Sequence, residues 1–259
     1  MNAKPMLVFL LAALLVAGCS TAAAPTISPV ATPAAGGAQA TATSAQAAAA
    51  GVLSYADMNV ILTDSFATLP WQMQLTTTTI ATGAAITGTI EVDASGNVQT
   101  MFEQPIAASA QALVDVVVIT PTVYMKIDGV SAAALEVVGL QPGQWTKMSV
   151  GQDTLGLAQF ALAAVNPTEL FNFLGIGTIF NLPGAQQDVF KLVGTEEVNG
   201  VQANIYTFES TDSTGTTTFR IAVGVSDSRV HSIESTGPVQ TTSMTMSYPS
   251  SLSITAPIP

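Results

Sequence analysis

Alternating apolar and polar positions dominate the chain from about residue 71 onward. In the segment 123–128, Val123, Met125 and Ile127 alternate with Tyr124 and Lys126. A period of two predicts strands that bury one face of a sheet. The pattern predicts strands at 71–80, 86–92, 98–103, 113–119, 123–128, 145–150, 189–193, 201–209, 216–223, 229–236, 240–248 and 252–256.

Two parts of the chain show helical spacing instead. Residues 53–69 predict one amphipathic helix that ends before Pro70. Residues 155–165 and 167–174 also favour helix, and Asn166-Pro167 is typical of a helix start. A helix, strands, a helical insertion and further strands predict an α+β fold with an antiparallel sheet.

The first 18 residues predict an export signal. Lys4 precedes an apolar run that is too short for a membrane span, which needs roughly 20 residues. The order Leu-Val-Ala-Gly-Cys at 15–19 resembles the lipobox of bacterial lipoproteins. This resemblance implies that residues 1–18 are removed and that the thiol of Cys19 receives a diacylglyceryl group. An ordinary secretory signal and an uncleaved anchor are the alternatives.

The next segment predicts a tether. Residues 20–50 contain no charged residue and are rich in Ala, Thr and Pro. Three prolines interrupt helix, and little apolar bulk is present for a core. We expect Cys19 and this segment, 19–50, to form a flexible lipidated tether, and residues 51–259 to fold as one domain.

Charge is scarce along the chain. Only 9% of the residues are charged and 48% are hydrophobic, whereas an ordinary domain carries about 25% charged residues. Threonine suits the solvent face of a strand, so Thr-rich strand faces account for part of the missing charge. An apolar interior larger than packing requires accounts for the rest.

The composition also excludes several function classes. Six Lys and Arg residues against 17 Asp and Glu give a net charge of −11, so we expect no nucleic-acid partner. One Cys and one His exclude an internal disulfide framework and a multi-histidine zinc site, so we expect no metal. Nucleotide-binding glycine motifs are absent from the sequence, and we expect no cofactor.

Catalytic motifs are equally poor. His231 lies in an alternating segment without a G-x-S-x-G elbow, which is typical of a structural or exposed histidine. Asp57 and Asp64 share one helix but form no acid–base pair by pattern. Glu196-Glu197 is expected on a solvated loop. We therefore expect no catalytic residue and no enzyme.

Three segments resemble a known family. The stretch 190–201, ending in Gly-Thr-Glu-Glu-Val-Asn-Gly-Val and leading to Tyr206, resembles the G-x-E-x-V-N-G-V … Y hairpin of the LppX/LprG-type lipoproteins. Segments 123–126 and 145–148 resemble their paired strands, and 245–257 resembles their closing strands. The resemblance implies a LolA-like fold, a curved antiparallel β half-barrel closed by helices around an apolar cavity.

The same resemblance implies a ligand and its site. Family members bind acylated lipids or glycolipids, and the apolar residues of the middle segment would line or gate the cavity, with Gly175, Gly177 and Gly184 as hinge points. Core packing is the competing interpretation for each lining residue. The predicted lipid-contacting residues are Met101, Met125, Phe160, Leu162, Leu170, Phe171, Phe173, Leu174, Ile176 and Phe180.

The function expected from these features is that of a membrane-anchored envelope lipoprotein. It would lie on the extracytoplasmic face of the membrane and carry or present acylated lipids or glycolipids. The sequence identifies neither the lipid nor a membrane partner that exports it. The alternative is a β-rich surface or sensory lipoprotein that binds a protein partner and no lipid.

Overall fold

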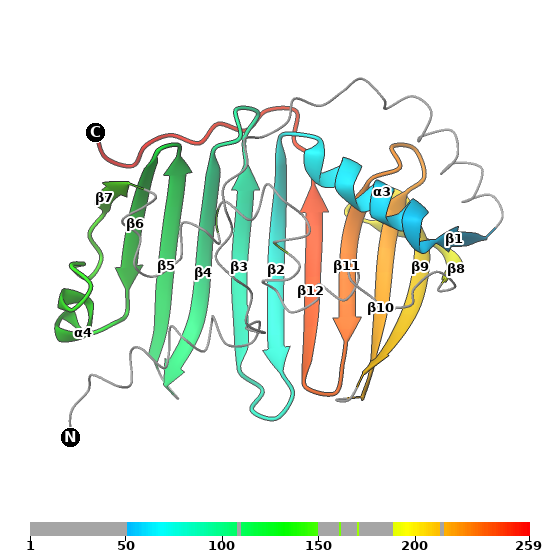
Figure 1. The fold of residues 1–259 in the computed structure, drawn as a ribbon, viewed down its shortest axis with the longest axis horizontal. Coiled ribbons are helices and arrows are strands. Elements are labelled where there is room, and N and C mark those ends of the chain that lie inside the picture. Colours follow the sequence, from blue (N-terminus) through cyan, green and yellow to red (C-terminus); the bar gives the residue numbers. More distant parts are fainter. Residues whose placement is uncertain (1–50, 108–109, 150–160, 162–169, 171–188, 213–214) are drawn as a thin grey trace.

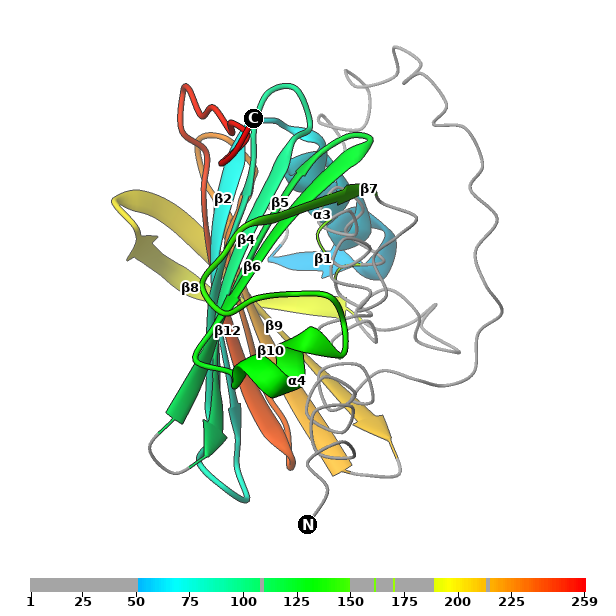
Figure 2. The same cartoon turned by 90° about the vertical axis from the view of Figure 1, so that its left-hand side faces the viewer.

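One antiparallel sheet of twelve strands forms the molecule (Figure 1). The computed structural model describes residues 51–107, 110–149, 161, 170, 189–212 and 215–259. The strand order is β1-β8-β9-β10-β11-β12-β2-β3-β4-β5-β6-β7, so β1 and β7 are the two edges and the sheet is not closed into a barrel. Seen along its edge, the sheet is twisted and curved, with α3, α4 and β1 on the same side (Figure 2).

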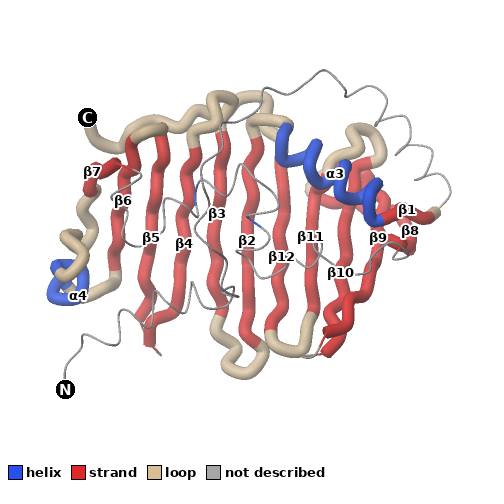
Figure 3. The backbone as a smooth tube through the Cα atoms, viewed as in Figure 1, coloured by secondary structure: helices blue, strands red, loops and turns tan. Residues whose placement is uncertain are grey.

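The elements of the first part of the chain are those the alternation and helical spacing predict, with two short additions. The additions are β1 and α4, which have too few residues for a recognisable period. The elements are β1 (Val52–Ser54), α3 (Tyr55–Ala67), β2 (Trp71–Thr79), β3 (Ala85–Val92), β4 (Val98–Ala107), β5 (Ala110–Ile119), β6 (Thr122–Asp128), α4 (Ala132–Glu136) and β7 (Thr146–Ser149). α4 lies beside β6 and β7 at one edge of the sheet (Figure 3).

The second part of the chain completes the sheet from the other side. Its strands are β8 (Val189–Val198), β9 (Val201–Asp212), β10 (Gly215–Gly224), β11 (Val230–Thr236) and β12 (Gln240–Ser247). β12 pairs with β2, so the last strand lies beside the first long strand at the centre of the sheet. This pairing joins the two parts of the chain into one sheet.

The start of α3 is set by a capping box. The hydroxyl of Ser54 accepts from the backbone N–H of Asp57 at 3.1 Å, and the Asp57 carboxylate accepts from the backbone N–H of Ser54 at 3.1 Å. Both side chains satisfy amides that the first helical turn leaves free. The helix therefore begins at Tyr55, two residues later than the pattern predicts.

Two expectations about strands and loops were wrong. Residues 252–256 form no strand; instead the backbone N–H of Ile254 donates to Asp93 at 3.2 Å, which holds this segment against the β3–β4 hairpin. Glu196 and Glu197 lie within β8, because the β8–β9 turn needs just Asn199 and Gly200, both with positive φ. Glu196 there pairs with Arg220 of β10.

The two faces of the sheet differ as the alternation predicts. We call the face on which α3 lies the inner face and the opposite one the outer face. Hydroxyl side chains cover the outer face, as in the registered and exposed set Ser243, Thr76 and Thr87 on three adjacent strands. The inner face is apolar and forms the main hydrophobic core. Thr-rich strand faces therefore take the place of charged side chains on the outer face of the sheet, as the composition predicts.

Candidate functional site

The candidate site is the part of the inner face formed by strands β2 to β6. Strand register places apolar side chains of all five strands in continuous rows, because alternate residues of paired strands share a face. One row is Trp71, Val92, Val98, Val118 and Val123, and the next is Met73, Ile90, Thr100, Val116 and Met125. All ten side chains are buried.

A third row brings an aromatic ring over a glycine. Gly88 pairs with Phe102, and a Cβ built on Gly88 would come within 2.3 Å of the Phe102 ring. The ring therefore lies directly over the backbone of β3. Glycine is needed at this position because any side chain would displace the ring.

The other half of the inner face has a cover of its own. Helix α3 packs against β1, β8 and β11 through Met58, Ile61, Leu62 and Phe66. We call β1 and β8–β11 together with α3 the helix-covered half, and β2–β6 the β2–β6 half. Within the helix-covered half, the ring centroids of Phe190 and Phe208 lie 5.0 Å apart, and those of Phe208 and Phe219 lie 6.1 Å apart.

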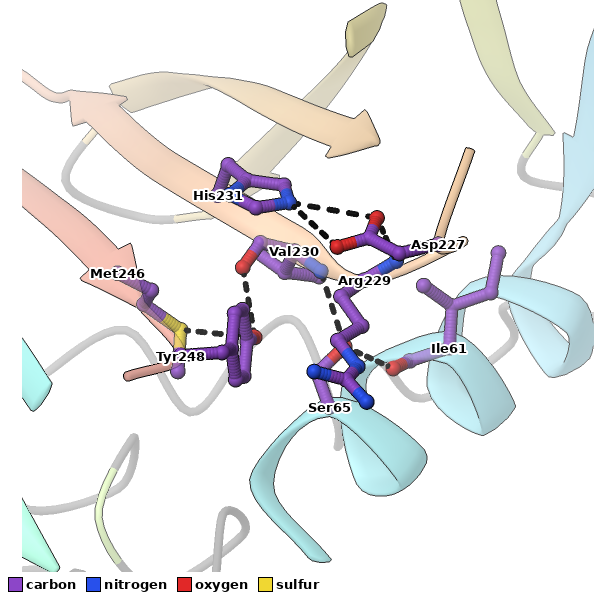
Figure 4. Close-up of polar contacts among 8 residues, drawn as sticks. All are labelled: Ile61, Ser65, Asp227, Arg229, Val230, His231, Met246 and Tyr248. Carbon is purple, nitrogen blue, oxygen red and sulfur yellow. Dashed lines mark hydrogen bonds and ion pairs between the residues drawn. The ribbon is translucent and has the colours of Figure 1, made fainter. Parts of the chain in front are cut away.

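Polar contacts fasten α3 to the sheet at a bulge in β11 (Figure 4). His231 is the extra residue of this bulge, between Val230 and Ser232. The backbone N–H of Val230 donates to the Ser65 hydroxyl of α3 at 2.9 Å, and its carbonyl accepts from the Tyr248 hydroxyl at 2.8 Å. Both backbone groups of Val230, which borders the bulge, are thus satisfied by side chains.

The histidine at this bulge is buried and paired. His231 Nε2 lies 3.0 Å from Asp227 Oδ2, and its ring packs edge-to-face on Tyr248. Burial raises the pKa of Tyr248, and the Arg229 guanidinium lies 4.9 Å from the centre of its ring. The Ser65 hydroxyl donates its proton to the Ile61 carbonyl at 2.6 Å, so it does not donate to His231 as a catalytic serine would. These residues instead anchor the helix to the sheet.

Four buried polar atoms have no hydrogen-bond partner in the part of the chain that the structure describes. They are Tyr55 OH, Asn59 Oδ1, Thr100 Oγ1 and Tyr206 OH. Burial raises the pKa values of Tyr55 and Tyr206; for Tyr206 the nearby Asn204 amide opposes the rise without reaching hydrogen-bond geometry. Three of the atoms belong to the helix-covered half, and Thr100 belongs to the β2–β6 half.

The predicted lipid-contacting residues fall into three groups. Met125 lies on the inner face and is fully buried, and Leu170 is fully buried in the same core cluster together with Ala161. Met101 lies on the outer face with 48% of its surface exposed, because its neighbours Thr100 and Phe102 face inward. The others lie outside the described residues: Phe160, Leu162, Phe171, Phe173, Leu174, Ile176 and Phe180.

Other predicted features also lie beyond the described residues. Cys19, the signal segment 1–18, the tether 19–50 and nearly all of 155–182 belong to this group. The apolar cavity depends on that middle segment and stays a prediction. Alternation alone could have found the missed inner-face residues Thr100 and Val116, because each lies two residues from a buried strand position.

The described residues contain no cluster of three or more His, Cys, Asp or Glu side chains able to hold a metal ion. None of their helices has the length and apolar character needed to cross a membrane.

Comparison with known proteins gives matches of fold alone. No family model matches the chain, and no curated protein matches it in sequence. Its structure is similar to LprF from Mycobacterium bovis, with a TM-score of 0.45 and 10% identity over 78% of this chain and 96% of LprF. It is similar to MucB with a TM-score of 0.37 and 14% identity, over 77% of this chain and 60% of MucB.

A further match is the MucA/MucB complex of Pseudomonas aeruginosa, with a TM-score of 0.35 and 13% identity over 76% of this chain and 58% of the matched one. The described part of the chain forms an open, curved antiparallel sheet, as expected from the sequence resemblance to LppX/LprG-type lipoproteins.

Proposed function

We propose that this chain is a membrane-anchored envelope lipoprotein that binds the acyl chains of lipids or glycolipids on the inner face of its sheet and carries or presents them. The observation that supports this proposal most is the division of the inner face. The face is apolar across β2–β6, whereas α3 packs mainly against β1, β8 and β11 and contacts β2 at Trp71, whose indole N–H donates to the Phe66 carbonyl at 3.1 Å. An apolar surface formed by five strands is suited to a ligand that is itself apolar.

Hydrophobic burial would supply the affinity. Each methylene removed from water contributes about 0.8 kcal/mol, so a chain of 16 carbons gains on the order of 10 kcal/mol before the costs of ordering it. Methionines such as Met73 and Met125 suit such a surface, because their flexible side chains adapt to irregular apolar partners. The activity we propose is therefore binding without a chemical reaction.

The anchor follows from the N-terminal sequence. The lipobox-like order at 15–19 supports acylation of Cys19, and more than one acyl chain holds a protein stably on a membrane. Cys19→Ala should move the protein from the membrane fraction to the soluble extracytoplasmic fraction. Continued membrane retention of this variant would contradict the lipoprotein assignment.

Lipid binding is tested on the full chain purified from membranes. Extraction with organic solvent followed by mass spectrometry should recover lipid at about one equivalent or more. Val116→Phe, which enlarges a side chain on the inner face, should lower this amount several-fold. Leu113→Phe is the matched control on the outer face of the same strand and should leave it unchanged.

The alternative is binding of a protein partner without lipid. Met101 of β4 and Leu113 of β5 lie on the outer face of adjacent strands and are 48% and 42% exposed, so a protein partner could pack on them. Absence of extracted lipid, together with failure of the stripped protein to bind a fluorescent fatty acid, would refute the lipid proposal. Thermal unfolding of each variant separates loss of binding from loss of the fold.

A further inference from the structure

One polar side chain is buried among the apolar rows of the β2–β6 half. Thr100 of β4 is 0% exposed and lies on the inner face. Its registered neighbours in the adjacent strands are Ile90 and Val116, and both are buried apolar residues. Its hydroxyl has no hydrogen-bond partner among the residues that the structure describes.

Such a hydroxyl is unfavourable for the protein alone. Burying a hydroxyl without a partner costs free energy, and valine would give nearly the same shape and strand preference without that cost. A buried water does not resolve the problem, because an ordered water needs two to four polar partners. The side chains of Ile90 and Val116 are apolar, so beside them a water would find the Thr100 hydroxyl as its one side-chain partner.

We propose that the Thr100 hydroxyl is a hydrogen-bonding subsite for an uncharged oxygen of the bound lipid, such as the carbonyl oxygen of an acyl ester. This inference rests on the lipid-binding function proposed above. The hydroxyl donates to the ligand oxygen when the acyl chain lies across β3–β5, and it is left without a partner when the ligand is absent. Thr100 then positions the ester group among otherwise apolar contacts.

The charges around the site favour an uncharged oxygen over a carboxylate. The inner-face residues of β2–β6 in the described part of the chain include no Lys, Arg or His. Lys126 of β6 alternates with Met125 and Ile127, so it lies on the outer face, where it pairs with Asp115 at 2.6 Å. A buried carboxylate would have no compensating cation there, whereas an ester needs one donor.

Tyr206 provides a matched control. Its hydroxyl is equally without a partner and the residue is 1% exposed, but it lies on β9 in the helix-covered half. β4 and β9 are separated by five strands in the sheet, so Tyr206 lies in a different part of the inner face from Thr100. Tyr206→Phe removes one orphan hydroxyl without touching the proposed subsite.

The experiment compares the affinities of two uncharged probes and one charged probe for the full chain after its lipid has been extracted. Methyl palmitate, octadecane and palmitate are delivered from mixed micelles and compete with a fluorescent apolar dye. Thr100→Val should weaken methyl palmitate binding about 3- to 10-fold, as expected for one neutral hydrogen bond, and leave octadecane unchanged. Thr100→Ser should retain most of the ester affinity.

Stability provides a readout that a merely structural threonine would not give. Thr100→Val should raise the thermal midpoint of the lipid-free protein while it lowers ester affinity. Tyr206→Phe should raise the midpoint in the same way and leave the affinity for every probe unchanged.

Three outcomes would overturn the subsite. They are unchanged ester affinity in Thr100→Val, equal loss for ester and hydrocarbon, or tighter binding of palmitate than of its methyl ester. If wild-type protein binds none of the probes, the proposed function itself fails.

Discussion

The two halves of the inner face bury apolar side chains in different ways. In the helix-covered half, α3 lies on the strands, the rings of three phenylalanines pack together, and Ser65 joins the helix to Val230. In the β2–β6 half, the rows consist mainly of Val, Ile and Met, and Thr100 has an unused hydroxyl. Directional contacts thus define one half, and adaptable side chains define the other.

This difference separates a structural core from a surface suited to a ligand. Aromatic stacks and hydrogen bonds to a helix select one arrangement and resist change. Methionine side chains, by contrast, adapt to several apolar partners with little loss. Substitutions in the helix-covered half should therefore reduce stability, and those in the β2–β6 half should change ligand binding as well.

The largest expected effect is in the phenylalanine stack. Phe219→Ala leaves a cavity in the helix-covered half and should lower the free energy of unfolding by about 3–5 kcal/mol. Chemical denaturation measures this change. Val193→Ala, at a side chain 60% exposed, is the control and should change it by less than about 0.5 kcal/mol. A small effect of Phe219→Ala would show that this half is not a packed core.

The next effect concerns the ring over β3 in the other half. Gly88→Ala places a methyl group against Phe102 and should destabilise the protein by about 1–3 kcal/mol. Phe102→Leu added to Gly88→Ala should recover part of this loss. Gly194→Ala is the control, since a Cβ there meets nothing within 4 Å. If Gly194→Ala lost as much stability as Gly88→Ala, the loss would come from the change in backbone freedom and not from the contact with Phe102.

A similar or smaller effect is expected at the helix anchor. Ser65→Ala leaves the buried Val230 amide without its acceptor and should cost about 1–3 kcal/mol. Hydrogen exchange of that amide should become faster than in wild type. Ser247→Ala, on the exposed outer face, should change neither quantity. Unchanged exchange at Val230 in Ser65→Ala would mean that the anchor does not hold α3.

The smallest effect depends on pH and lies on the β3–β4 hairpin. Burial raises the pKa of Asp93, but hydrogen bonds from Asn97, Ile254 and Ser95 outweigh it, so its pKa lies below the ordinary value. The carboxylate therefore stabilises the fold above an ordinary aspartate pKa of about 3.9, and this contribution disappears as the pH falls through the lowered value.

Asp93→Asn should reduce the thermal midpoint at pH 7 and show a smaller decrease than wild type between pH 5 and pH 2. Asn97→Ala removes one donor, at 2.9 Å, and should act in the same direction more weakly. A decrease in Asp93→Asn as steep as in wild type would assign the acid sensitivity to other groups.

Much of the fold could be predicted because its signals are local. The alternation in β2–β6 and β9–β12 specified the strands and their buried faces, and Asn199-Gly200 specified a tight hairpin turn. Met125 was placed in the interior by that alternation. Met101 was misplaced because residue type was weighed above position: the period of two puts it opposite Thr100 and Phe102.

Contacts between distant segments could not be predicted in this way. No pattern in β12 indicates that it pairs with β2, and none in 252–256 indicates that Asp93 is its partner. The role of Ser65 depends on a bulge in β11 that lies 165 positions along the chain. The unused hydroxyl of Thr100 became visible once the register had placed Ile90 and Val116 beside it.

The amino-acid sequence by itself determined which residues form strands, which face of each strand is buried, and the lipobox-like order before Cys19. These properties depend on backbone periodicity and on neighbouring residues, so they can be read in one dimension. The tertiary structure decided strand order, which half of the sheet α3 covers, and which polar atoms lack partners. Those depend on long-range packing, where many pairings satisfy the same local pattern and just one buries every face at once.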